Sequence, residues 1–277
     1  MAFIQVNLMS NALHRTVQVN VILPTDKYDS YGHYVDPDEP LKTLYLLHGI
    51  YGSSVDWVNK TRIQAFAEHN NLAVIMPSGD NMFYLNHPLS GNNYEDFIGK
   101  ELVEMTRRMF HLSRKREDTF IAGLSMGGYG AIHNGLKYPE TFSVIVGLSS
   151  ALILEDNLSK TNDVPELIQR RDYAEFCFGN LDDALKNECN PEIQIRKLKE
   201  EGRCIPEIFL ACGEDDSLLP PNVKFAAFLK NEGVNVNFEI GPGAHEWDFW
   251  DRYIRKTVYE WLPLNGSSEG IHSGNIS

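Results

Sequence analysis

A serine flanked by glycines is the first feature of this sequence that could carry chemistry. Residues 123–127 read Gly-Leu-Ser-Met-Gly, between an apolar run at 119–122 and a helix-like run at 129–138. This pattern is typical of a nucleophile elbow, a sharp strand-to-helix turn that exposes the serine hydroxyl. The turn leaves room only for glycine two residues before and two residues after the serine. An ordinary glycine-rich turn is the alternative. Ser125 is therefore a candidate nucleophile that needs support from the rest of the chain.

A serine hydroxyl is a poor nucleophile at neutral pH, so it needs a base held by a carboxylate. Where an elbow carries the serine, the acid and then the histidine follow it along the chain, each in a loop after a strand. An apolar run at 236–240 leads through a glycine-rich turn into His245. We therefore expect His245 to be the base.

Three acidic residues compete for the role of the orienting carboxylate. Glu214, Asp215 and Asp216 directly follow the apolar run at 208–211. Asp216 is furthest along this turn and best able to reach a histidine loop, so we favour it over Asp215. We assign Glu214 to capping the turn.

Acyl transfer also needs backbone N–H donors for the oxyanion of the tetrahedral intermediate. One donor is expected from Met126, directly after the serine, and the other from the loop after an earlier strand. The sequence His-Gly-Ile at 48–50 follows the apolar run at 44–47. We expect Ile50 to be the second donor and His48 to be structural.

Aromatic side chains near the expected strand ends are candidates for the substrate pocket. Trp57 follows the oxyanion loop, Phe83, Tyr84 and His87 follow the apolar run at 72–76, and Trp247 follows the histidine. Such rings could stack on a phenolic acyl group. The alternative is that they pack the domain.

Continuous apolar runs alternate with helix-like stretches along the chain. Continuous apolarity favours strands buried on both faces of a parallel sheet, and the alternation favours a doubly wound α/β fold. The expected buried strands are 44–47, 72–76, 120–122, 142–148, 208–211 and 234–240. The expected helices are 61–69, 95–110, 129–138, 222–231 and 245–261. An alternating run at 15–23 predicts an antiparallel strand with one exposed face, and 28–40 a hairpin loop.

One connection is much longer than the others. Residues 150–206 separate two expected strands and carry a helical pattern of their own at 192–201. Connections in α/β domains are usually shorter, so we expect a cap-like insertion over the strand ends, where ligands bind. Packing beside the sheet is the alternative. We expect 1–264 to form a single domain and 265–277 a flexible tail.

Composition narrows the class of protein. The 277 residues are 43% hydrophobic, and the formal net charge of −13 argues against nucleic acid or an anionic membrane as partner, since both bind clustered Lys and Arg. We find no membrane-spanning run and no secretory signal pattern. Four cysteines (Cys177, Cys189, Cys204 and Cys212) fit no metal or disulfide spacing, so we expect free thiols, no metal and a cytoplasmic protein.

Several blocks together resemble the esterase D superfamily of α/β-hydrolases, and most of all the bacterial tributyrin esterases. The blocks are residues 46–49, 120–131, 212–216 and 245–247, and the similarity runs from about 4 to 262. The superfamily includes short-chain carboxylesterases, feruloyl esterases, acetyl esterases of plant polysaccharides and S-formylglutathione hydrolases. The resemblance implies an α/β-hydrolase fold and a serine ester hydrolase.

The resemblance places the catalytic triad on Ser125, Asp216 and His245 and the oxyanion donors on Ile50 and Met126. It implies no metal and no cofactor. Short-chain acyl esters are the expected small-molecule substrates, with feruloyl (cinnamoyl) or acetylxylan-type esters as the alternative. Three further possibilities stay open. The protein could be an acyltransferase or a catalytically silent binding protein, and it could form a homo-oligomer.

Two departures argue against an S-formylglutathione hydrolase. That group usually has a histidine where this chain has Tyr129, and it lacks the His-Gly pair at 48–49. We therefore rank this activity below carboxylester hydrolysis.

Overall fold

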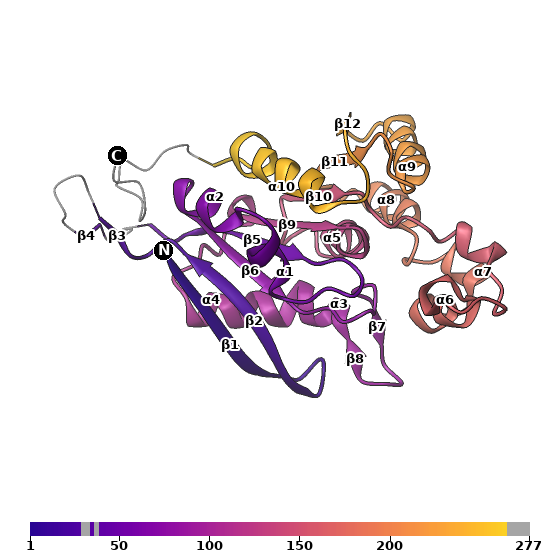
Figure 1. The fold of residues 1–277 in the computed structure, drawn as a ribbon, viewed down its shortest axis with the longest axis horizontal. Helices are drawn as coiled ribbons and strands as arrows, with labels where there is room; N and C mark the ends of the chain where they lie inside the picture. The colour runs from indigo at the N-terminus through magenta and orange to yellow at the C-terminus, as the bar shows by residue number, and fades with distance from the viewer. Residues whose placement is uncertain (29–33, 36–38, 265–277) are drawn as a thin grey trace.

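A twisted sheet runs through the centre of the molecule (Figure 1). The computed structural model describes residues 1–28, 34–35 and 39–264. The 8-stranded sheet has the order β1-β2-β6-β5-β9-β10-β11-β12. Its strands are β1 (Ala2–Ser10), β2 (Arg15–Leu23), β5 (Lys42–Leu47), β6 (Leu72–Pro77), β9 (Thr119–Leu124), β10 (Val144–Leu148), β11 (Glu207–Gly213) and β12 (Val236–Gly241). Two short ribbons pair β3 (Lys27–Tyr28) with β4 (Tyr34–Val35) and β7 (Asn86–His87) with β8 (Asn92–Asn93).

Strand direction divides the sheet into two parts. β1 and β2 pair antiparallel, and β2 pairs antiparallel with β6. From β6 to β12 every pairing is parallel. The carboxyl ends of these strands therefore meet at one edge, where ligands bind in open α/β sheets. The predicted mostly parallel, doubly wound α/β fold is confirmed.

Helices cover both faces of the sheet, and each face has its own hydrophobic core. Alternate side chains of a strand point to opposite faces, so Leu44 and Leu46 pack in one core and Tyr45 and Leu47 in the other. The first core lies under α1 (Asp56–Lys60), α2 (Ile63–His69), α10 (Trp247–Lys256) and the π-helix η5 (Thr257–Trp261). The second lies under α3 (Tyr94–Asp96), the π-helix η1 (Phe97–Glu101), α4 (Leu102–Met109), α5 (Met126–Lys137), α8 (Pro191–Glu200) and α9 (Leu219–Asn231).

The long connection between β10 and β11 contributes helices of its own. α6 (Arg171–Phe178) and α7 (Leu181–Ala184) lie beyond the strand ends, at the right of Figure 1. The short 3₁₀ segments η3 (Asp156–Ser159) and η4 (Leu167–Gln169) precede them; η2 (Arg116–Asp118) precedes β9. The sequence pattern predicted α8 here but neither α6 nor α7.

Some predicted elements differ from the observed ones. Strand β1 was not predicted, although Ile4, Val6 and Leu8 alternate along it. The strand predicted at 15–23 is present, but its second half is buried on both faces, since Val21 packs in one hydrophobic core and Ile22 in the other. Strand β12 is not buried on both faces, since it lies at the sheet edge.

Two predictions cannot be compared with the structure in full. Most of the loop predicted at 28–40 and all of the tail predicted at 265–277 lie outside the described residues. Only the short β3–β4 pairing falls within that loop.

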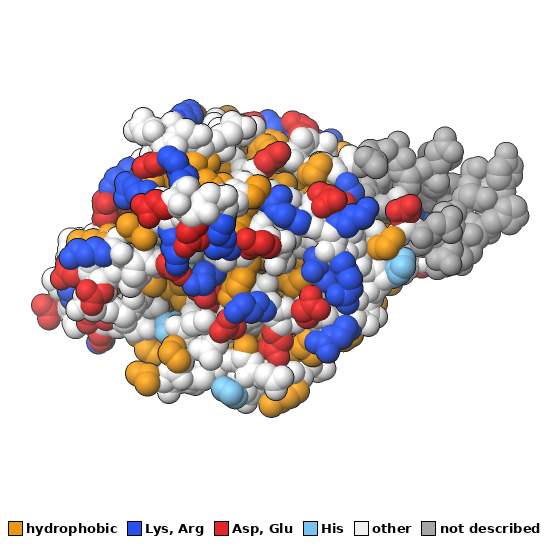
Figure 2. All heavy atoms as spheres, turned by 180° about the vertical axis from the view of Figure 1, so that it is seen from behind, with side chains coloured by type: hydrophobic (Ala, Val, Ile, Leu, Met, Phe, Trp, Pro, Cys, Tyr) orange, Lys and Arg blue, Asp and Glu red, His pale blue; other side chains and the backbone are white. Residues whose placement is uncertain are grey.

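The surface mixes charges of both signs. On the face seen in Figure 2, Lys and Arg side chains alternate with Asp and Glu side chains over most of the described surface. The described residues include exposed ion pairs such as Lys199–Glu232 and Arg203–Glu140. No helix in the described part of the chain has the length and apolarity that crossing a membrane requires.

Candidate active site

Ser125 lies at the turn between β9 and α5, near the middle of the sheet. Its backbone has φ 54° and ψ −119°, a conformation that L-residues rarely adopt and that packed surroundings must enforce. The Ser125 N–H donates to the carbonyl of Leu148 on β10, and the Ser125 carbonyl accepts from Tyr129 N. The turn is therefore fixed on both sides with the side chain directed out of the sheet edge.

Close backbone contacts explain the two glycines around the serine. A Cβ at Gly123 would lie 2.2 Å from the carbonyl oxygen of Gly127. A Cβ at Gly127 would lie 2.5 Å from the carbonyl oxygens of Leu47 and His48. Since these obstacles are backbone atoms, no side-chain movement can relieve them.

Gly127→Ala should lower the thermal stability of the protein. Inside a helix this change normally stabilises by up to about 1 kcal/mol, but here the new methyl group pushes α5 away from the end of β5. Thermal melting of the variant measures the effect, with Lys230→Ala on exposed α9 as a control. A melting temperature above that of the wild type would contradict this account of the elbow.

A chain of hydrogen bonds joins the side chains of Ser125, His245 and Asp216. His245 Nε2 lies 3.0 Å from Ser125 Oγ, and His245 Nδ1 lies 2.9 Å from Asp216 Oδ2. The three residues come from the loops after β9, β11 and β12. The structure thus brings together residues up to 120 positions apart in the sequence, in the geometry that a nucleophile, its base and an orienting acid require.

Asp216 is held as a carboxylate. Burial raises the pKa of the Asp216 carboxyl, but hydrogen bonds from His245, Leu218 N–H and the Ser149 hydroxyl outweigh burial and lower it below its usual value. At neutral pH a negative charge therefore lies behind His245, where it would stabilise a protonated imidazole. Ser149 was not singled out in the sequence, although it directly follows strand β10.

The two neighbouring acids point elsewhere. Asp215 and Glu214 are both exposed, and their backbone N–H groups pair with the carbonyls of Gly243 and Gly241. Only Asp216 of these three accepts a hydrogen bond from the His245 ring. Its role as the catalytic acid stays a prediction.

Ile50 and Met126 lie where oxyanion donors are expected. Both line the pocket that contains Ser125. In the part of the chain that the structure describes, neither backbone N–H has an acceptor within the protein. The loop before Ile50 passes very close to the elbow, since a Cβ at Gly49 would lie 3.4 Å from Ser125 Cβ.

His48 has a structural place beneath this loop. Its Nδ1 lies 2.7 Å from the carbonyl oxygen of Gly49, and its Nε2 accepts from Gly79 N–H at 2.8 Å. The ring must therefore carry its proton on Nδ1 and donate to Gly49. Burial lowers the pKa of His48, so the ring is neutral and has no free nitrogen to act as a base.

Ser125 opens into a pocket of about 440 Å³. The loop after β5, which carries Ile50, and the elbow form one side of the pocket. Residues of the long connection between β10 and β11 form the other side. The apolar lining is Ile50, Tyr51, Phe83, Met126, Ala151, Ile153, Ile168, Tyr173, Ala174, Phe178 and Leu218; the polar lining includes Asp156, Asn157, Lys160 and Gln169. Residues of this long connection thus line the same pocket as Ser125, and its role as a cap stays a prediction.

Of the five aromatic residues expected near this pocket, Phe83 lies in its lining and the other four lie outside it. The Trp57 indole is buried and donates to the carbonyl of Leu47. Trp247 packs edge-on against Trp57. Tyr84 is fully buried and donates to the carbonyl of His48, and His87 lines a different cavity.

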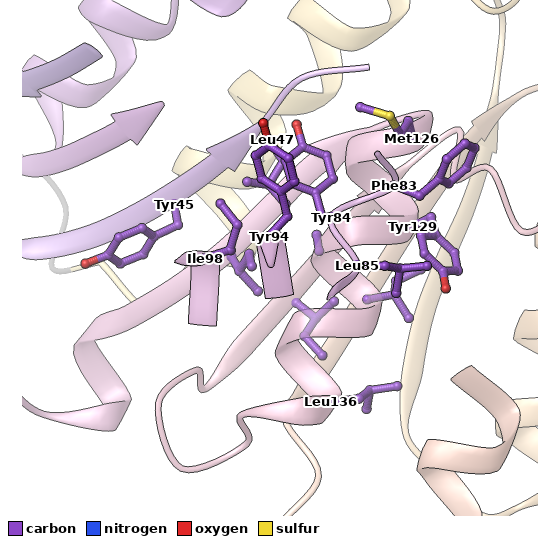
Figure 3. Close-up of a cluster of buried hydrophobic side chains, with 14 of the residues drawn as sticks. Tyr45, Leu47, Phe83, Tyr84, Leu85, Tyr94, Ile98, Met126, Tyr129 and Leu136 are labelled. Atoms are coloured by element: carbon purple, nitrogen blue, oxygen red, sulfur yellow. The ribbon is translucent and has the colours of Figure 1, made fainter. Parts of the chain in front are cut away.

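The backbone between Met82 and Leu85 explains why Phe83 enters the pocket while Tyr84 does not. Phe83 and Tyr84 both have positive φ, 51° and 57°. Figure 3 shows the consequence: Phe83 points toward Met126 and Tyr129, and Tyr84 points away from them toward Leu47. Consecutive residues in this rare conformation cannot be recognised from residue types, so the sequence alone does not show which of the two rings enters the pocket.

The histidine and cysteine residues that the structure describes form no cluster suited to a metal ion. The described residues contain no group of three or more His, Cys, Asp and Glu side chains that could hold a metal ion. His133 lies inside helix α5, where its Nε2 pairs with Glu95 at 2.7 Å. All four cysteines are free thiols.

Comparison with known families places the chain. The model of the family named Esterase matches residues 10–259. The chain belongs to the Esterase family. It is 42% identical to an acetyl esterase of Caldicellulosiruptor saccharolyticus over 262 residues, which is 95% of this chain and 98% of that relative. The resemblance inferred from the sequence blocks is therefore confirmed.

Solved structures agree with this family assignment. FphF, a fluorophosphonate-binding serine hydrolase of Staphylococcus aureus, superposes with a TM-score of 0.81 at 34% identity, covering 94% of this chain and 98% of that one. An S-formylglutathione hydrolase (FrmB) of the same species gives 0.80 at 33%, with the same coverage. A ferulic acid esterase shares the fold at 21% identity and a TM-score of 0.67, over 93% of this chain and 96% of that one.

Proposed function

We propose that this esterase-family protein is a serine carboxylesterase that hydrolyses short-chain acyl esters, acetyl esters above all, through an acyl-enzyme on Ser125. The observation that carries the proposal is the hydrogen-bond chain from Ser125 Oγ through His245 to the buried Asp216. The 42% identical acetyl esterase supports the choice of acyl group. Turnover of p-nitrophenyl acetate by the purified protein, lost in Ser125→Ala, tests it.

Acylation follows from this arrangement. Ser125 Oγ attacks the ester carbonyl carbon and passes its proton to His245 Nε2, while the carbonyl oxygen becomes an oxyanion. The free N–H groups of Ile50 and Met126 would donate to that oxyanion. The intermediate then collapses, the bond to the alcohol oxygen breaks, and protonated His245 returns the proton to the departing alcohol.

Deacylation repeats the same steps with water. His245 Nε2 takes a proton from a water molecule, whose oxygen attacks the acyl carbon. The bond to Ser125 Oγ breaks, His245 reprotonates the serine, and the carboxylic acid leaves. The Asp216 carboxylate remains ionised throughout and stabilises the imidazolium in both halves of the reaction.

Hydrolysis should fall at acid pH. A protonated His245 cannot accept the proton from Ser125, so kcat/KM decreases as the imidazole is protonated. A pH profile with a pH-stable ester measures the effect, and a rate that stays flat down to about pH 4 would contradict a histidine base.

Short acyl chains should be preferred over long ones. Each methylene that finds an apolar wall contributes about 0.8 kcal/mol, but a pocket of about 440 Å³ that must also hold the ester itself offers such a wall only to the first few carbons. kcat/KM along a p-nitrophenyl series from acetate to octanoate measures this preference. A steady rise through octanoate would contradict a short pocket.

S-formylglutathione hydrolysis is the second candidate. The observation that favours it is the 33% identical FrmB structure, while Tyr129 replaces the histidine expected for that activity. Assaying S-formylglutathione beside p-nitrophenyl acetate, methyl ferulate and an acetylated xylan oligomer ranks the candidates. A kcat/KM for the thioester far above that for acetate would reverse their order.

A further inference from the structure

We propose that the Phe178 side chain closes the acyl end of the pocket and thereby sets the upper limit of acyl length; this inference rests on the proposed esterase function. Phe178 is the last residue of α6, is 6% exposed, and lines the pocket that contains Ser125. It also lines a second cavity of about 690 Å³. One aromatic side chain therefore lies between two separate spaces.

Phe178 belongs to a compact aromatic cluster with Phe83 and Tyr129. The Phe178 ring centroid lies 4.7 Å from that of Phe83 and 5.6 Å from that of Tyr129. The centroids of Phe83 and Tyr129 are 5.7 Å apart. Figure 3 shows the Phe83 ring beside Tyr129 and Met126. Tyr129 lies one helical turn after Ser125, and such a turn rises about 5.4 Å. The cluster thus leaves space for only a few carbons beyond the serine.

The chemistry of the surroundings assigns this end of the pocket to the acyl group. Ala174 and Tyr173 join Phe83 and Phe178 in an apolar wall. By contrast, the polar residues Asp156 and Ser217 line both this pocket and a neighbouring groove of about 370 Å³. That groove is lined by leucine and proline side chains as well as by the Lys224–Glu155 ion pair, so it offers the alcohol group both apolar and polar contacts.

The second cavity could hold the end of a longer acyl chain once the Phe178 ring is removed. Its lining includes Leu85, Pro88, Leu89 and Phe176, which offer apolar contacts. Phe176 lies on the same helix but is 55% exposed and stacks on His87, and it does not line the serine pocket. Truncating Phe178 should join the two spaces, whereas truncating Phe176 should not.

The test compares wild type, Phe178→Ala and Phe176→Ala on p-nitrophenyl esters from acetate to octanoate. For Phe178→Ala we expect the octanoate-to-acetate ratio of kcat/KM to rise at least tenfold, since each methylene that gains an apolar wall contributes about fourfold. The ratio for Phe176→Ala should stay that of the wild type. Because truncating a buried ring lowers stability, Phe178→Leu is the second variant, with a smaller shift in the same direction.

Three results would overturn the inference. One is an unchanged ratio in both folded Phe178 variants, and another is an equal shift in Phe176→Ala, which would indicate general loosening. The third is a change in preference along a series of acetate esters with longer alcohols, which would place Phe178 on the alcohol side. A wild type without activity on any short ester would instead refute the proposed function itself.

Discussion

Ser125→Ala should abolish ester hydrolysis while leaving the fold intact. In the proposed mechanism Ser125 Oγ is the atom that forms the acyl-enzyme, and removing the nucleophile of such a triad costs on the order of 10⁶ in turnover. Alanine can keep the same strained turn, because the N–H and carbonyl of residue 125 make its hydrogen bonds to Leu148 and Tyr129. Turnover of p-nitrophenyl acetate and labelling by a fluorophosphonate probe should both disappear, with an unchanged circular dichroism spectrum.

Ser150→Ala is the matched control for this experiment. Ser150 is also buried and follows strand β10, but its hydroxyl has no hydrogen-bond partner among the described residues. Its alanine variant should keep most of the activity and the probe labelling. If purified Ser125→Ala retained more than a few per cent of wild-type turnover, another residue would have to be the nucleophile.

The parts of the site that sequence could predict are those fixed by local backbone chemistry. Gly123 and Gly127 reflect contacts that no side chain permits, and the acid and histidine follow strands whose carboxyl ends must share one edge of the sheet. Ser125, Asp216 and His245 were therefore found from pattern and order alone. The geometry that unites them agrees with that interpretation and leaves their catalytic role to experiment.

The pocket wall could not be predicted in the same way. Tyr173 and Phe178 line the pocket of Ser125 because of the course of the connection after β10. That course depends on how the whole connection packs against the rest of the protein. The position of Trp57 in the sequence suited the pocket wall equally well, yet its buried indole N–H donates to the carbonyl of Leu47. A buried indole N–H normally requires such a partner, but the sequence does not show which one is available.

The remaining large effect concerns the acid. Asp216→Asn should reduce kcat by about 10⁴, as in other triads, whereas Asp215→Asn should change it little because Asp215 is exposed and makes no contact with the histidine ring. The reason lies in the tautomer of His245. Leu218 N–H donates to Asp216 Oδ1 at 2.8 Å, so an asparagine at this position would keep its carbonyl oxygen there and turn its NH₂ group toward His245 Nδ1.

That exchange of acceptor for donor would force the His245 proton onto Nε2, where it blocks transfer from Ser125. Both variants should keep the wild-type melting profile closely enough for kinetics at 25 °C, the standard temperature for such comparisons. Steady-state kinetics with p-nitrophenyl acetate, measured on the two asparagine variants side by side, decides between the acids. A larger loss in Asp215→Asn than in Asp216→Asn would mean that the hydrogen bond between Asp216 and His245 is structural and that the catalytic carboxylate has been misassigned.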